Sequence, residues 1–99
     1  MAERLDEATI AARLAELPGW TRAGDEIRRT FQAPDFLTGV RIVNEVAVAA
    51  EAANHHPDID IRWRRVSFAL TTHDAGGLTD LDFDLARRIQ TFATEHEAD

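Results

Sequence analysis

Apolar residues recur at helical spacing in three segments of the chain, which predicts three amphipathic helices. The first ends at Pro18-Gly19, the second runs from about residue 35 to 53, and the third begins at residue 79. The second carries additional apolar residues, more than one sheet face can cover, which favours a further contact such as a partner subunit. The apolar faces are formed by Ile10, Leu14 and Leu17, by Phe36, Val40, Val43, Ala47 and Ala50, and by Leu81, Leu85, Ile89 and Phe92.

The residues that flank these segments fit helix boundaries. Asp6 and Thr79 are favourable N-caps, and Thr79 together with Asp82 forms a capping box in its aspartate form. Asn54 is a credible C-terminal stop for the second helix. We interpret Asp82 and the neighbouring acidic residues as structural, because a helix N-terminus favours negative charge.

Two segments between the helices have the character of β-strands. Residues 20–31 contain two short β-prone runs around the turn-forming triplet Ala23-Gly24-Asp25, which predicts a hairpin. After Pro57, apolar residues occupy odd positions at Ile59, Ile61 and Trp63 and then even positions from 66 to 70. Since a one-residue slip moves every side chain to the opposite face, we expect a second hairpin with its turn at Arg64-Arg65.

The order helix-strand-strand-helix-strand-strand-helix predicts an α+β fold, a four-stranded antiparallel sheet with helices packed on one face. The chain contains no repeat, low-complexity tract or linker, so residues 1–99 form one domain. The residues expected on the sheet are Ile59, Ile61, Val66, Phe68 and Leu70, with Leu81, Leu85 and Ile89 packed against them.

Composition narrows the function. The 99 residues include no cysteine, which excludes disulfides, thiolate metal sites and a cysteine nucleophile. The net charge of −7 disfavours general nucleic-acid binding. No apolar run approaches the ~20 residues of a membrane span, and the acidic N-terminus lacks a signal-peptide core, so we expect a cytoplasmic location. A chain this short buries only about 60–65% of its surface, which favours self-association.

Three of the four histidines lie at positions where side chains can converge. His55 and His56 follow the end of the second helix, and His73 follows a strand. An imidazole exchanges protons near neutral pH, since its ordinary pKa is about 6.5. The two sites can meet at one edge of a two-layer fold, or they can be unrelated surface loops; their spacing alone leaves both readings open.

Other chemistry has weaker support. The histidines show no HxH or HExxH pattern, so we expect no metal. The only serine, Ser67, is mid-strand, which argues against a serine nucleophile. The Gly76-Gly77 loop is either an anion cradle or a plain turn. Trp20 is either a core residue or a shelf for a flat ring.

Two motifs resemble a known family. Glu51-Ala52-Ala53-Asn54-His55-His56-Pro57-Asp58, followed by Leu70-Thr71-Thr72-His73-Asp74-Ala75-Gly76-Gly77-Leu78-Thr79, resembles the pterin-4a-carbinolamine dehydratases. That family is also known as the dimerisation cofactor of a homeodomain transcription factor. The resemblance covers the chain from Pro18-Gly19-Trp20 to the last helix, and departs from the family at the hairpin tip, Trp63-Arg64-Arg65.

The resemblance implies an enzyme that dehydrates 4a-hydroxytetrahydropterin to quinonoid dihydropterin and so recycles the pterin of aromatic amino-acid hydroxylases. General acid–base catalysis by imidazoles suits this reaction, and no cofactor is implied. The residues that it implies are the catalytic trio His55, His56 and His73, and the pterin-binding residues Glu51, Pro57, Thr72, Asp74, Ala75 and Trp20.

Two alternatives stay open beside this reading. The chain could be a non-catalytic oligomerisation scaffold or transcription cofactor of the same fold, or an enzyme that acts on another pterin. As partners we expect the pterin substrate and a second copy of the chain, as a homodimer or homotetramer, without nucleic acid or membrane.

Overall fold

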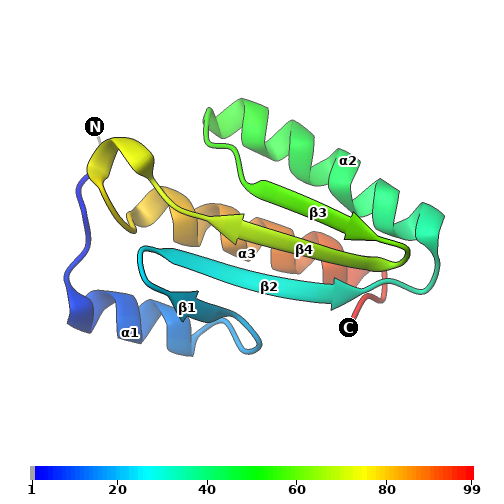
Figure 1. Cartoon of the computed structure of the whole chain (residues 1–99), viewed down its shortest axis with the longest axis horizontal. Helices are drawn as coiled ribbons and strands as arrows, with labels where there is room; N and C mark the ends of the chain where they lie inside the picture. Colours follow the sequence, from blue (N-terminus) through cyan, green and yellow to red (C-terminus); the bar gives the residue numbers. More distant parts are fainter. Residues whose placement is uncertain (1) are drawn as a thin grey trace.

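The computed structural model describes residues 2–99 and contains a four-stranded sheet with three longer helices (Figure 1). The order of elements is helix-strand-strand-helix-strand-strand-helix, as predicted. A single 3-10 turn, η1, lies between the last strand and the last helix. The elements are α1 (Glu7–Ala15), β1 (Thr21–Ala23), β2 (Glu26–Gln32), α2 (Phe36–Ala53), β3 (Asp58–Arg62), β4 (Arg65–Leu70), η1 (His73–Ala75) and α3 (Asp80–Glu95).

The sheet has the strand order β1-β2-β4-β3, and all of its pairs are antiparallel. The longest pairing joins β2 to β4 from Ile27–Leu70 to Gln32–Arg65. Figure 1 shows α2 and α3 on the same face of the sheet, with α1 beside β1. The α+β class is therefore confirmed. The pairing matters for function because it places the end of β4, where η1 begins, next to the start of β2.

The helix ends confirm the predicted caps. The Asp6 carboxylate accepts a hydrogen bond from the Thr9 amide at 2.8 Å and begins α1. Asp35, which had not been predicted as a cap, begins α2 in the same way, accepting from the Thr38 amide at 2.7 Å. Asn54 ends α2 in the left-handed conformation, with φ 50°. These caps satisfy backbone groups that a helix end would otherwise leave without partners.

The second hairpin turns one residue earlier than predicted. Arg62 pairs with Arg65, so the turn is Trp63-Arg64 rather than Arg64-Arg65. Trp63 has φ 57° and is 75% exposed, and it belongs to the turn instead of the strand. This turn resolves the change of parity, because Ile61 then lies opposite Val66 on one face of the sheet.

The buried face of α2 differs from the predicted face by a rotation of about one residue. The residues that face the core are Gly39, Ile42, Val46, Ala49 and Ala50, whereas Phe36 is 48% exposed. Gly39 explains the difference. A Cβ at this position would lie 3.1 Å from Val66 Cγ2, so α2 approaches β4 where it has no side chain. A hydrophobicity pattern gives glycine no weight, and therefore misplaced the face.

The core lies between the sheet and the helices. Phe31 and Phe68 contact edge to face, with ring centroids 6.1 Å apart, and both are fully buried. Leu85 and Ile89 of α3 pack there as predicted, but Leu81 is only half-buried. Ile59 and Ile61 lie on the edge strand β3 and stay 39% and 37% exposed. Within residues 2–99, none of the helices is long and apolar enough to span a membrane.

Candidate active site

The three predicted histidines line one cavity of about 280 Å³ at the end of the molecule where α2 stops and β4 runs into η1. His55 and His56 come from the segment that follows α2, and His73 is the first residue of η1. The sequence separates these groups by 17 or more positions, and the antiparallel sheet brings them together. The remaining walls are formed by Asn54, Thr71, Thr72, Asp74 and Leu81.

Asn54 directs the chain into this cavity. Its left-handed backbone ends α2, and the His55 amide bonds back to the Ala50 carbonyl at 3.0 Å. The chain therefore turns sharply, which places consecutive histidines at the cavity wall. Non-glycine residues other than Asn and Asp adopt this conformation only at a cost, which gives Asn54 a structural reason for its position.

His55 is held by a buried carboxylate on α3. Its Nε2 lies 2.6 Å from Asp82 Oδ1; Asp82 is 0% exposed and His55 is 8% exposed. The second carboxylate oxygen, Oδ2, accepts from the Thr72 hydroxyl at 2.8 Å and from the Thr79 amide at 2.9 Å. Because a carboxylate only accepts hydrogen bonds, the proton in the first contact belongs to His55 Nε2. In the neutral ring this orientation leaves Nδ1 as the nitrogen that can accept a proton.

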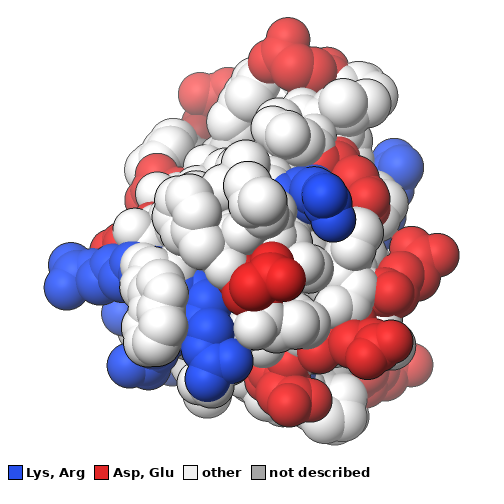
Figure 2. Space-filling view, turned by 90° about the vertical axis from the view of Figure 1, so that its right-hand side faces the viewer, with Lys and Arg blue, Asp and Glu red and all other residues white. Residues whose placement is uncertain are grey.

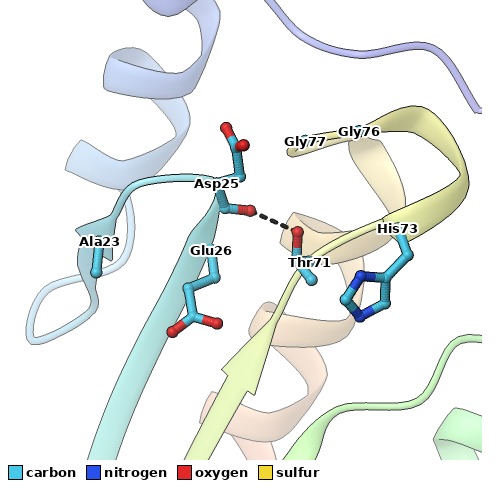
Figure 3. A pocket seen from close by; sticks show the side chains of 7 residues that line it. All are labelled: Ala23, Asp25, Glu26, Thr71, His73, Gly76 and Gly77. Carbon is cyan, nitrogen blue, oxygen red and sulfur yellow. Dashed lines mark hydrogen bonds between the residues drawn. The ribbon is translucent and has the colours of Figure 1, made fainter.

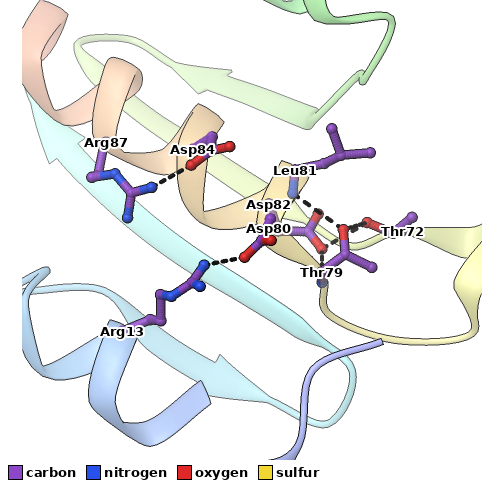
Figure 4. Close-up of polar contacts among 8 residues, drawn as sticks. All are labelled: Arg13, Thr72, Thr79, Asp80, Leu81, Asp82, Asp84 and Arg87. Atoms are coloured by element: carbon purple, nitrogen blue, oxygen red, sulfur yellow. Dashed lines mark hydrogen bonds and ion pairs between the residues drawn. The ribbon is translucent and has the colours of Figure 1, made fainter. Parts of the chain in front are cut away.

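The same aspartate completes the N-terminus of α3 (Figure 4). Thr79 is the N-cap, and its amide and hydroxyl form the capping box with Asp82 and the first-turn backbone. The Thr72 and Thr79 hydroxyls lie 2.8 Å apart, which links the box to the end of β4. Asp82 thus performs two tasks: it caps a helix and it positions a histidine. Sequence analysis found only the first.

His56 and His73 have more open environments. His56 Nε2 lies 2.6 Å from Glu51 Oε1, and both side chains are exposed. Glu51 therefore contacts His56 and does not itself line the cavity. His73 is exposed, and its imidazole makes no hydrogen bond within residues 2–99. The trio therefore combines one anchored imidazole, one tethered to a surface carboxylate, and one free to contact a ligand.

The loop after β4 forms a second wall with free backbone donors. Thr72 forms an isolated bridge with Gly77, which closes the loop around η1. The amides of Ala75, Gly76 and Gly77 donate to carbonyls inside the loop. The amides of His73 and Asp74 have no backbone partner in the described part of the chain. An adjoining cavity of about 260 Å³ is lined by Thr72, Asp74 and Ala75, among others.

The sequence model of the family described as Pterin 4 alpha carbinolamine dehydratase matches residues 3–92. The chain belongs to this family. Membership identifies the activity as that of a dehydratase, a hydro-lyase, and agrees with a site made of imidazoles at a cavity.

Relatives of similar length support the assignment. A protein of Roseiflexus sp. (strain RS-1), provisionally named pterin-4-alpha-carbinolamine dehydratase, is 63% identical over 90% of this chain and 96% of its own length. A protein of Nocardia farcinica with the same provisional name is 58% identical over 92% of this chain and 96% of its own.

Solved structures confirm the dehydratase fold. The crystal structure of a transcriptional coactivator/pterin dehydratase from Brucella melitensis superposes with a TM-score of 0.89. It is 33% identical and covers 92% of this chain and 99% of that one. A pterin dehydratase-like protein identified as a RuBisCO assembly factor matches with a TM-score of 0.62 at 16% identity, over 75% of this chain and 86% of that one. The second likeness concerns the fold alone.

The structure separates the predicted site residues of the dehydratase into two groups. Thr72 and Asp74 line the histidine cavity, and Ala75 lines the adjoining one. Pro57 and Trp20 line neither cavity. Trp20 is only 4% exposed, donates from Nε1 to Gln90 at 3.0 Å and packs edge to face on Phe31. The prediction of Trp20 as a wall of the pocket therefore has no support in the structure, which places it in the core.

Several residues that line the histidine cavity were not assigned to a site from the sequence. Asn54 had been interpreted as a helix stop and Leu81 as a core residue, and Thr71 was noted only as part of the second family motif. In the sequence, Asp82 could be recognised only as the acid three residues after Thr79. A capping box explains an acid at that position equally well, so the sequence did not reveal the contact with His55. No group of three or more His, Asp or Glu side chains in residues 2–99 is arranged to hold a metal ion.

Proposed function

We propose that the protein dehydrates 4a-hydroxytetrahydropterin by general acid–base catalysis with His55, His56 and His73. The observation that carries this proposal is the placement of all three imidazoles around one cavity. The hydroxyl on C4a takes up a proton and leaves as water, while the lone pair of N5 forms the C4a–N5 double bond. N5 then loses its proton, and the product is the quinonoid dihydropterin.

The carboxylates beside two of the histidines support this chemistry. Each positioned acid–base group typically raises the reaction rate by about 10²–10⁴-fold. It must lie within hydrogen-bond reach of the atoms that exchange protons. Asp82 fixes the ring of His55, and Glu51 restrains that of His56. A negative neighbour also stabilises the imidazolium that forms when a ring accepts a proton.

The loop after β4 supplies partners for the flat pterin. The free amides of His73 and Asp74 are donors for the ring carbonyl, and Thr72, Asp74 and Ala75 line the space for the pyrimidine edge. Glu51 acts through His56, and Pro57 fixes the chain after it. The physiological role that follows is recycling of the pterin cofactor of aromatic amino-acid hydroxylases.

Single alanine variants of the three histidines test the proposal. Each of His55→Ala, His56→Ala and His73→Ala is expected to lower turnover of the carbinolamine by one to several powers of ten. His96 serves as the matched control, because it follows the C-terminal end of α3, pairs with Glu45 of α2 at 2.7 Å and does not line the cavity. His96→Ala should keep the turnover of the parent. If folded His55→Ala and His73→Ala variants are as fast as the parent, the acid–base assignment is wrong.

Self-association is the second part of the proposal. The large apolar side chains that remain exposed are Phe36, Leu37, Val48, Ile59, Ile61 and Trp63. Figure 2 shows the end of the molecule where α2 begins and the β3–β4 turn lies, with uncharged surface between basic and acidic groups. Strand β3 is also an open edge of the sheet, and natural proteins normally pair or cover such edges.

A homodimer or homotetramer built on these surfaces accounts for the exposed residues. Light scattering at micromolar concentration should give a multiple of 11.1 kDa. Val48→Glu, a change at a 72% exposed position of α2, should shift the mass toward the monomer. A mass of one chain across this range contradicts the proposal.

A further inference from the structure

Residues 2–5, the N-terminal strap, lie beside the loop between β4 and α3 that carries His73 (Figure 1). The Leu5 amide donates to the Leu78 carbonyl at 2.9 Å, and the Leu5 side chain packs against the core. Asp6 follows directly and caps α1. The last residue of the strap is therefore anchored to the end of the loop.

Arg4 of the strap lies on the glycine pair of the loop. A Cβ built on Gly77 would come within 3.0 Å of Arg4 Cδ and 3.2 Å of Arg4 Cγ. Both separations are shorter than the optimal contact between carbon atoms, about 3.5–4.0 Å. Gly76 has φ 72°, a conformation that favours glycine, whereas the backbone of Gly77 lies outside the left-handed region. The absence of a side chain at Gly77 is therefore explained by the aliphatic stem of Arg4 that lies against it.

The loop closes on itself through weak hydrogen bonds. The Thr72 amide donates to the Gly77 carbonyl at 3.3 Å, and the Gly77 amide donates to the Thr72 carbonyl at 3.4 Å. Both distances exceed the usual N–H···O range of about 2.7–3.2 Å. Figure 3 shows His73 at one end of the loop and the glycine pair at its other end. The contact with Arg4 thus adds to a closure that is weak by itself.

Ala2 and Arg4 of the strap relate differently to the proposed site. Ala2 lines the adjoining cavity together with Asp74 and Ala75. Arg4 lines neither that cavity nor the histidine cavity. The loop supplies the His73 imidazole and the free amides of His73 and Asp74. Any effect of Arg4 on the site therefore passes through the loop.

We infer that Arg4 is a positioning residue for the dehydration, and that its stem, packed on Gly77, holds the loop in the conformation that binds the pterin. The inference rests on the proposed function, in which the loop supplies His73 and the donors for the ring carbonyl. Where a binding-competent conformation is only partly populated, the apparent dissociation constant rises by the inverse of that fraction. Bound substrate then holds the loop itself, so the chemical step keeps its rate.

Arg4→Ala separates positioning from overall stability. Without the stem the loop is open for part of the time, so KM for the carbinolamine should rise about 3- to 10-fold while kcat stays within about twofold of the parent. A loss of overall stability would instead reduce the folded fraction, which lowers kcat and leaves KM unchanged. Arg4→Lys retains Cγ and Cδ and should restore the KM of the parent.

Gly77→Ala tests the contact from the other side. The added Cβ displaces the Arg4 stem, so KM should rise as it does in Arg4→Ala. The double variant Arg4→Ala/Gly77→Ala has no stem to displace, so its KM should equal that of Arg4→Ala, the non-additivity expected of residues in contact. Arg87→Ala is the control, because it removes the same charge from α3, where Arg87 pairs with Asp84 and lines neither cavity. Its KM and kcat should be those of the parent.

Hydrogen exchange measures the loop without substrate. The amides of Gly76 and Gly77 donate only within the loop, so they become exposed to solvent when it opens. Their exchange, followed by nuclear magnetic resonance, should be about 3- to 10-fold faster in Arg4→Ala than in the parent. Arg87→Ala should leave both exchange rates unchanged.

The outcomes distinguish this inference from the proposed function. If the parent is active and Arg4→Ala keeps its KM, the inference is refuted and the proposed function stands. A fall in kcat alone, or a double variant whose KM rises by the product of the two single effects, also refutes the inference. A parent that does not accelerate the dehydration refutes the proposed function and the catalytic role of Arg4. The exchange rates then decide by themselves whether the strap holds the loop, and equal rates in the parent and Arg4→Ala refute that contact too.

Discussion

Replacing Asp82 by asparagine removes the charge of a side chain that both caps α3 and contacts the proposed catalytic residue His55. The side chain is 0% exposed, and its two oxygens contact His55 Nε2, Thr72 Oγ1 and the Thr79 amide at 2.6–2.9 Å. An amide of the same shape fits the space but has only one acceptor oxygen. If its NH₂ faces Thr79, two donors oppose each other; if it faces His55, the imidazole must change tautomer.

The cost of this change follows from the hydrogen bonds that the carboxylate makes. A hydrogen bond to a charged group contributes about 1.5–3 kcal/mol net, and a buried donor without a partner costs a further ~1–3 kcal/mol. We expect the free energy of unfolding of Asp82→Asn to fall by about 2–4 kcal/mol. For a domain of this size the unfolding temperature should fall on the order of 10–20 °C.

Turnover should fall with stability, but for a separate reason. A His55 ring that is free to rotate or to change tautomer no longer presents the same nitrogen, so kcat should fall about 100-fold, within the range for a positioned acid–base group. KM should change little, because Asp82 is buried behind the cavity wall. Turnover is measured by stopped flow below the unfolding temperature, with the folded fraction followed by circular dichroism.

Asp80→Asn is the matched control for this variant. Asp80 lies two residues earlier in the same helix turn, is exposed and pairs with Arg13. Its loss should cost no more than about 1 kcal/mol and leave kcat unchanged. An Asp82→Asn protein with the stability and kcat of the parent would show that the carboxylate neither stabilises α3 nor positions His55. A variant that loses stability but keeps kcat would show that Asp82 acts only as a helix cap.

Two further predictions concern helix ends. Hydrogen bonds from the Thr38 side chain and backbone lower the pKa of Asp35 below its ordinary 3.8. The stability that the Asp35 carboxylate adds is therefore complete above the pKa of the unfolded state and is lost as the pH falls through the lower pKa of the folded state. Asp35→Asn, which still caps α2, should therefore flatten the rise in unfolding temperature between about pH 2.5 and 5; an unchanged profile contradicts this. Asn54→Val should lower the free energy of unfolding by about 1–2 kcal/mol because of its left-handed backbone, whereas Asn54→Gly should not; chemical denaturation distinguishes the two.

Local signals made most of the fold predictable. The N-caps Asp6 and Thr79 and the helix stop at Asn54 each act within four residues, so the sequence around them contains the whole interaction. The change of parity after Ile61 indicated a hairpin, although it did not place the turn to the residue. The prediction of the buried face of α2 was wrong because that face includes Gly39, which contributes by allowing close contact with Val66.

The site was predictable only in part. The histidines stand in two motifs specific enough to indicate that they act together, and the antiparallel sheet brings them to one cavity. The hydrogen bond between His55 and Asp82 joins residues that are 27 positions apart and lie on different segments, so no local sequence pattern predicts it. Trp20 is the opposite case: from the sequence it was either a core residue or a shelf for a flat ring, only the family resemblance implied a binding wall, and its contacts with Phe31 and Gln90 place it in the core.

The proposed function requires that three imidazoles around one cavity remove water from the carbinolamine. The decisive measurement is the decay of 4a-hydroxytetrahydropterin, followed by ultraviolet absorbance after rapid generation in the presence of the protein. We predict that the decay rate rises above the spontaneous rate in proportion to the concentration of the parent protein. The His55→Ala/His73→Ala double variant, folded by circular dichroism, should return the decay to the spontaneous rate. A decay with the parent protein that equals decay in buffer alone contradicts the claim.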